Sequence, residues 1–129
     1  MLEKEFVPYQ ESLELKKLGF NEPCFGYFIL GQLFVTSDTV YNSLDIPVYK
    51  APTFSQAFRW FRENHNLHSN ISSWRSNDNL FFYHEFEIYS LTSSYSEGDE
   101  YPTYEEAELA CLRKLIEIVK GGNKWKNHI

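Results

Sequence analysis

The sequence lacks any apolar run near the ~20 residues that cross a membrane. Its first residues, from Met1 to Phe6, are charged and lack the apolar core of a secretion signal. We therefore expect a cytoplasmic protein. Only two cysteines occur, Cys24 and Cys111, and in a cytoplasmic chain we do not expect a disulfide between them.

Motifs of common enzyme and metal sites are also missing. There is no G-x-S-x-G, Walker A, G-x-G-x-x-G or H-E-x-x-H sequence. The histidines His65, His68 and His84 could offer zinc three nitrogens, but no cysteine or carboxylate completes a recognised spacing. His84 and Glu85 point to opposite faces of one strand, so they cannot form an acid–base pair unaided. We expect no enzyme activity, no metal and no cofactor; an active site assembled from distant residues is the third hypothesis.

Lysine and arginine are absent from residues 76–112, although half of the acidic residues lie there, and the net charge is −6. One interpretation is a solvated surface whose final helix has acids at its start and bases at its end. The other is an acidic face that meets a basic partner. The residues of such a face would be Glu85, Glu87, Glu97, Asp99, Glu100, Glu105 and Glu108.

Hydrophobic residues make up 43% of the 129 residues and aromatic residues 18%, which excludes a disordered chain. This length favours one domain with a real core. We expect a single α+β domain over residues 1–122 and a short basic tail over residues 123–129. Aromatic residues at this density suit strands and binding surfaces alike.

Two segments about fifty positions apart share the pattern Pro-Thr-aromatic-x-(Gln/Glu)-Ala. In each, a threonine precedes Gln or Glu by three residues: Thr53 with Gln56, and Thr103 with Glu106. This spacing predicts a capping box, in which the threonine hydroxyl accepts from the N3 amide and the N3 side chain accepts from the backbone amide of the threonine. Helices are therefore expected over about 54–64 and 104–120. The two segments could mark a duplicated ββα unit, but the residues around them match poorly, which favours independent use of one helix-start motif.

The remaining pattern predicts a first helix over 8–18, ended by Gly19, and two β-hairpins. The expected strands cover residues 24–29 and 32–36 in the first hairpin, 68–74 and 80–91 in the second, and a short edge strand over 46–49. On the last long strand, Phe82, Phe86 and Ile88 share one face with His84. The predicted architecture is a mostly antiparallel sheet of two hairpins with three helices packed mainly on one face.

A second binding hypothesis is a nucleic-acid-binding regulatory domain. Aromatic residues interleaved with bases bind single-stranded nucleic acid. The residues that would form this site are Arg59, Trp60, Arg62, Trp74 and Arg75. The acidic start of the last helix and a pI of about 5.2 argue against contacts with phosphate, so we do not expect binding to free nucleic acid.

Three sequence segments show a resemblance to a known group of proteins: Phe25-Gly26-Tyr27, the segment from Gln56 to Glu63, and the segment from Thr103 to Lys120. They resemble small uncharacterised proteins of phages and prophages of Bacteroidetes. The resemblance implies no fold and no catalytic residues. It implies a non-enzymatic accessory protein of the host cytoplasm that binds a macromolecule, as inhibitor or modulator of a host protein such as a defence nuclease, in an anti-CRISPR-like manner. The partner would be a protein with a basic surface, alone or in a nucleoprotein complex, and no membrane would be involved.

Overall fold

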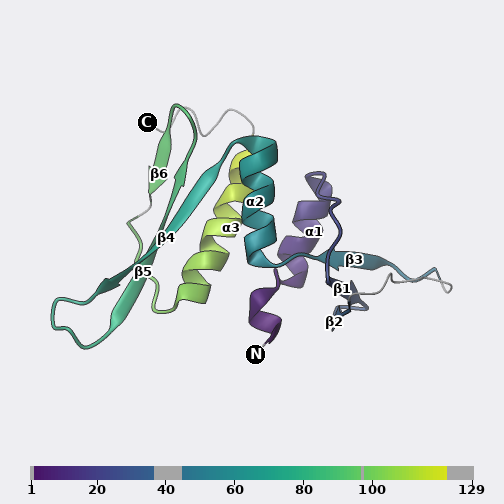
Figure 1. The fold of residues 1–129 in the computed structure, drawn as a ribbon, viewed down its shortest axis with the longest axis horizontal. Coiled ribbons are helices and arrows are strands. Elements are labelled where there is room, and N and C mark those ends of the chain that lie inside the picture. The colour runs from purple at the N-terminus through teal and green to yellow at the C-terminus, as the bar shows by residue number, and fades with distance from the viewer. Residues whose placement is uncertain (1, 37–44, 97, 122–129) are drawn as a thin grey trace. The chain divides into compact units, whose positions relative to one another are not determined.

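The structure is a computed structural model that describes residues 2–36, 45–96 and 98–121. The chain divides into two compact units, residues 1–57 and residues 58–129, and each is described by itself. Both units combine helices with antiparallel strands (Figure 1).

The first unit contains a three-stranded antiparallel sheet in the order β2-β1-β3. Its elements are a 3-10 helix Leu2–Glu5, α1 Tyr9–Lys17, β1 Gly26–Ile29, β2 Gln32–Val35 and β3 Val48–Ala51. Helix α1 packs on β3, and Tyr9 meets the ring of Phe28 edge-on at 5.4 Å between centroids. Phe28 is buried with Phe6 and Ala51, and these side chains form the core of this unit.

Glycine is needed at two positions of this unit. Gly19 ends α1 with φ of 105°, and the amide of Phe20 donates to the Leu15 carbonyl at 3.0 Å, as in a Schellman motif. Gly26 lies against the ring of Phe6, where an added Cβ would come within 2.7 Å of ring carbons. The predicted C-cap of the first helix is therefore confirmed.

The second unit is built on a sheet in the order β4-β5-β6. Helix α2, Phe54–His65, crosses the boundary between the units, and the other elements are β4 His68–Arg75, β5 Phe82–Tyr89, β6 Ser94–Ser96 and α3 Tyr104–Gly121. Helix α3 packs along one face of β5 and β4 (Figure 1). We call this the inner face. It carries the buried Phe86 and Ile88, opposite the apolar stripe of α3 that includes Cys111 and Leu115.

The structure confirms the α+β class, the three α-helices and the antiparallel hairpins. The two hairpins lie in separate sheets, and each sheet has a third strand in addition to its hairpin. One of these is β3, which lies two residues later than expected and begins after Pro47. The other is β6, which the sequence did not predict. The expected single domain over residues 1–122 stays a prediction, and the basic tail over 123–129 lies outside the described residues.

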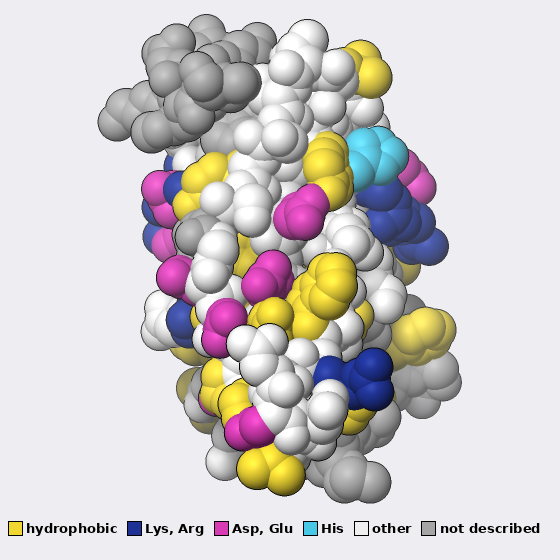
Figure 2. Space-filling model, turned by 90° about the vertical axis from the view of Figure 1, so that its left-hand side faces the viewer, with side chains coloured by type: hydrophobic (Ala, Val, Ile, Leu, Met, Phe, Trp, Pro, Cys, Tyr) yellow, Lys and Arg dark blue, Asp and Glu magenta, His cyan; other side chains and the backbone are white. Residues whose placement is uncertain are grey.

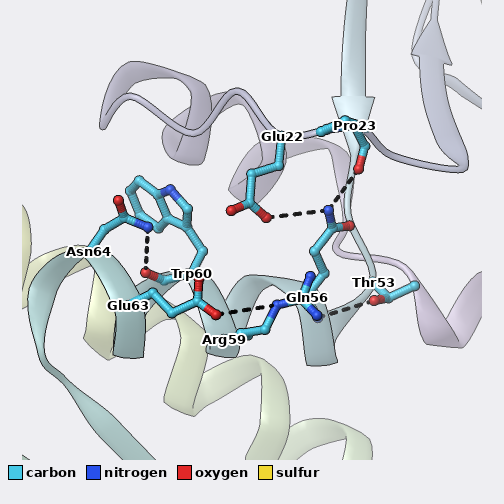
Figure 3. A network of polar contacts seen from close by, with 8 residues as sticks. All are labelled: Glu22, Pro23, Thr53, Gln56, Arg59, Trp60, Glu63 and Asn64. Carbon is cyan, nitrogen blue, oxygen red and sulfur yellow. Dashed lines mark hydrogen bonds and ion pairs between the residues drawn. The ribbon is translucent and has the colours of Figure 1, made fainter.

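Threonine caps both predicted helix starts. The amide of Gln56 donates to Thr53 Oγ1 at 3.2 Å, and the amide of Glu106 donates to Thr103 Oγ1 at 3.1 Å. In the described part of the chain, neither N3 side chain returns to the amide of its threonine. Gln56 instead donates through Nε2 to the Pro23 carbonyl at 2.8 Å (Figure 3). The boxes are thus half formed, and each depends on the threonine hydroxyl.

We predict that Thr53→Ala and Thr103→Ala each lower the free energy of unfolding by about 0.5–2 kcal/mol, because each removes the acceptor of one first-turn amide. Denaturant melts of the purified variants measure this cost. Serine at either position keeps the hydroxyl and is expected to restore most of the loss. A serine variant as unstable as the alanine variant would show that the threonine methyl group, and not the cap, stabilises the helix start.

Candidate functional site

The face of the β4-β5-β6 sheet turned away from α3, here called the outer face, carries polar and aromatic side chains. Strand alternation and the pairing of β4 with β5 determine its members. They are His68, Asn70, Ser72, Trp74, Tyr83, Glu85, Glu87, Tyr89, Ser94 and Ser96. Figure 2 shows this side of the molecule, with acidic and hydrophobic side chains interspersed over its middle.

The turn between β4 and β5 is fixed by the side chains of Ser76 and Asp78. Ser76 Oγ donates to Asp78 Oδ1 at 2.5 Å and accepts from the amides of Leu80 and Phe81, both at 3.2 Å. Asp78 Oδ1 also accepts from the Leu80 amide at 3.0 Å. These bonds, the one from Ser76 first, hold the pKa of Asp78 below its ordinary value. The turn thus has a defined shape although most of its residues are exposed.

Large hydrophobic side chains project into solvent at this end of the hairpin. We call Trp74, Leu80, Phe81 and Phe82, together with the turn over residues 76–79, the hairpin tip. The exposed fractions of the four side chains are 52% for Trp74, 81% for Leu80, 58% for Phe81 and 59% for Phe82. Single exposed apolar residues are ordinary, and the register places Trp74 on the outer face and Phe82 on the inner face. The candidate site is therefore centred on Phe81, which follows the ordered turn and is more than half exposed.

Two shallow cavities lie at the tip. One, of about 330 Å³, is lined by Phe81, Phe82, Tyr83, Glu100, Tyr101 and Pro102. The other, of about 300 Å³, is lined by Ser76, Asn77, Asp78, Phe81, Tyr83 and Glu100. Both combine aromatic rings with at least one carboxylate, and the residues common to both are Phe81, Tyr83 and Glu100.

Part of the predicted acidic face is assembled on the outer face. Glu85 and Glu87 are neighbours along β5, and Glu87 accepts a hydrogen bond from the hydroxyl of Tyr89. Tyr101 forms an antiparallel bridge with His84 through two backbone hydrogen bonds of 2.8 and 2.9 Å. This bridge brings the preceding Glu100 to the hairpin, where it lines both cavities. Asp99 is exposed beside it.

The other predicted acids lie elsewhere. Glu105 and Glu108 belong to α3, which covers the inner face, so the sheet separates them from Glu85 and Glu87. Glu105 is exposed in the first helical turn, where its charge complements the helix dipole. Glu108 is half-buried near Tyr104 and contributes to raising the pKa of that phenol, after burial. Glu97 lies outside the described residues.

The residues of the nucleic-acid hypothesis are not brought together. Trp60 is only 6% exposed and packs edge-on against Phe61, so it cannot stack on a base. Arg59 on α2 is paired with Glu63 at 3.8 Å (Figure 3). Arg62 is exposed on the same helix. Trp74 and Arg75 belong to another element, at the end of β4 next to the turn.

A serine–histidine pair on the inner face was not predicted. Ser73 Oγ and His84 Nδ1 are 2.8 Å apart, because these residues oppose each other across β4 and β5. Aligning the two predicted strands of the second hairpin in this register would have placed Ser73 opposite His84. Within the described residues, no carboxylate hydrogen-bonds the histidine, and the edge of the ring instead meets Tyr104 at 5.9 Å. The pair lacks the third group that orients a catalytic base in a triad.

The histidines and cysteines do not form a further reactive centre. In residues 2–36, 45–96 and 98–121, no three side chains of His, Cys, Asp or Glu are grouped as metal ligands. Burial lowers the pKa of His65 at the end of α2. Burial also raises the pKa of Cys24 to about 11 and that of Cys111 to about 12. Both thiols are free, and at neutral pH they lack the thiolate form that reacts.

We predict that Ser76→Ala lowers the free energy of unfolding by about 1–2 kcal/mol, because it removes the acceptor of two turn amides and the donor to Asp78. Hydrogen exchange at the Leu80 and Phe81 amides should become faster in this variant. Asn77→Ala is the matched control, since Asn77 is exposed in the same turn. Equal exchange rates in the wild type and in Ser76→Ala would contradict the assigned role of this hydroxyl.

The turn should also depend on pH. The pKa of Asp78 is lower in the fold than its ordinary 3.8, so its stabilising effect is complete above that value. The effect is lost as pH falls through the lowered folded-state pKa. We expect the amide shift of Leu80 to change in this acid range in the wild type and to stay flat in Asp78→Asn. Titration by NMR measures both, and a flat wild-type curve would contradict the carboxylate contact.

Comparison with protein-family models, with curated proteins and with solved structures finds no match to this chain. Within its described residues, no helix combines the length and the apolar character of a membrane span. What the protein does must therefore be inferred from the arrangement of its own side chains.

Proposed function

We propose that the chain binds a protein partner with a basic surface, through the hairpin tip and the adjoining acids of the outer face. The observation that carries this proposal is the exposed aromatic group held on a hydrogen-bonded turn and bordered by carboxylates. Glu100 and Asp78 line the cavities at the tip, and Glu85 follows Tyr83 on the outer face.

In this proposal the aromatic residues supply the binding energy, and the acidic residues determine which partners are attracted. Binding hot spots are enriched in aromatic side chains that lose water on contact, surrounded by a polar rim. An ordered turn reduces the conformational entropy lost on binding. The acidic rim accelerates encounter with a basic partner and excludes acidic ones. The tip supplies the first group, and Glu85, Glu87 and Glu100 supply the rim.

Free nucleic acid fits this surface poorly. The carboxylates that border the aromatic rings would repel phosphates, and Trp60 between the arginines of α2 is buried. Together with the resemblance to small phage and prophage proteins, this favours a modulator that acts in the host cytoplasm by binding a host protein. A nuclease is a partner of suitable chemistry, because proteins that hold nucleic acid present basic surfaces.

A photo-crosslinking amino acid at position 81 tests the proposal directly. We expect one discrete crosslinked protein in cells of the native host, competed by excess unlabelled wild-type chain. The matched control is position 91, whose leucine is 88% exposed beyond the opposite end of β5. The same products from both positions would overturn the proposal. Crosslinks at position 81 that disappear on nuclease treatment would favour the nucleic-acid alternative.

We predict that Glu85→Lys with Glu100→Lys weakens the isolated complex by at least about tenfold at low salt, and less at 1 M salt, where the Debye length is about 3 Å. The control is Glu105→Lys with Glu117→Lys, which changes the net charge equally but on α3. Titration of each variant against the captured partner gives the affinities, and thermal melts confirm folding. Equal weakening by both pairs would show that net charge, and not this face, determines binding.

A further inference from the structure

The two cavities at the tip share three lining residues. Phe81, Tyr83 and Glu100 line both, so the aromatic side chains lie between two hollows that each reach the same carboxylate. The first hollow adds Tyr101 and Pro102 as further walls. Phe81 is more than half exposed, so the hollows open to solvent and to an incoming side chain.

This combination of groups is complementary to a cation with a flat face. A guanidinium group stacks on aromatic rings through cation–π attraction and donates to a carboxylate in its own plane. An ammonium group offers a compact, strongly hydrated charge and gains less from stacking. A neutral side chain can donate a hydrogen bond to Glu100 but lacks the ionic attraction, and an acidic side chain is repelled. The surface thus selects arginine above lysine, and both above other residues.

The chain itself supplies no occupant in its described residues. Glu100 is exposed and takes part in no ion pair there. Arg75 is the basic residue nearest along the hairpin, but it opposes Phe82 on the inner face, whereas Tyr83 belongs to the outer face. Asp78 accepts from Ser76 and from the Leu80 amide, and it lines the second hollow as an additional negative charge.

We infer that the hairpin tip is a receptor for an arginine side chain of the partner, stacked on Phe81 or Tyr83 with its guanidinium facing Glu100. This inference rests on the proposed function and specifies the anchoring residue that the partner supplies. It also gives the acids of the tip distinct roles. Glu100 contacts the bound cation, whereas Asp78 mainly holds the turn that places Phe81.

The test uses the full chain and a short probe, the capped tripeptide acetyl-Gly-Arg-Gly-amide. The citrulline counterpart has the same shape but no charge. The lysine counterpart keeps the positive charge but lacks the planar guanidinium group. We expect NMR shift changes at Phe81, Tyr83 and Glu100 with the arginine probe. The lysine probe should bind about two- to fivefold more weakly, as expected for loss of cation–π stacking at an exposed site. The citrulline probe should bind more weakly still.

Variants of the chain separate the two contributions. Glu100→Gln should weaken the arginine probe more than the citrulline probe, because only the arginine probe loses an ionic contact. Phe81→Leu should weaken the arginine probe more than the lysine probe. Glu117→Gln on α3 is the control and should change neither. Equal affinity for arginine and citrulline probes, shifts confined to other residues, or no binding at millimolar probe would overturn the inference. Crosslinking of a protein at position 81 would still stand in those cases, so the two failures are distinguishable.

Discussion

The antiparallel pairing of β4 with β5 determines which of their side chains face α3 and which face outward. In this register His68 opposes Tyr89 and Arg75 opposes Phe82, so Phe86 and Ile88 face α3 while Tyr83 and Glu85 face outward. A slip of one residue in β5 would exchange its two faces and turn Glu85 and Glu87 toward α3. The burial of Phe86 and Ile88 therefore fixes the position of the acids on the outer face.

The turn at Ser76 extends this constraint to the tip. Its hydroxyl connects Asp78, Leu80 and Phe81, which closes the hairpin with the register that the core requires. The side chains of Ser76 and Asp78 hold the backbone amides of Leu80 and Phe81 in place, while the apolar side chains that follow the turn stay exposed. Order in the turn and exposure of the rings are compatible for this reason, and their combination is what a binding hot spot needs.

The features that the sequence predicted are local. Thr53 and Thr103 predicted the starts of α2 and α3, because an N-cap depends on a hydroxyl and an amide three residues apart. The shared face of Phe86 and Ile88 followed from strand alternation. The strand β6 was missed because Ser94-Tyr95-Ser96 has neither apolar alternation nor β-branched residues, and pairing with β5 alone makes it a strand.

The candidate site depended on contacts that are distant in sequence. Glu100 reaches the tip through the bridge between Tyr101 and His84, and no local pattern indicates that bridge. The composition showed an excess of acidic residues between Arg75 and Arg113. Only the structure shows that some of these acids lie on the outer face of the sheet and others on α3, which covers the inner face. Trp60 looked like a stacking residue beside its arginines, yet its place on the buried stripe of α2 makes it part of the core.

The carboxylates around the tip have a second physical consequence. Exposed rings on an ordered hairpin favour self-association, and two copies meeting tip to tip would bring Asp78, Glu85 and Glu100 of each against the same acids of the other. Like charges in such a contact repel, whereas a basic surface relieves the repulsion and covers the rings at the same time. On the proposed function, the same acids would therefore both attract a basic partner and oppose contact between two copies of this surface.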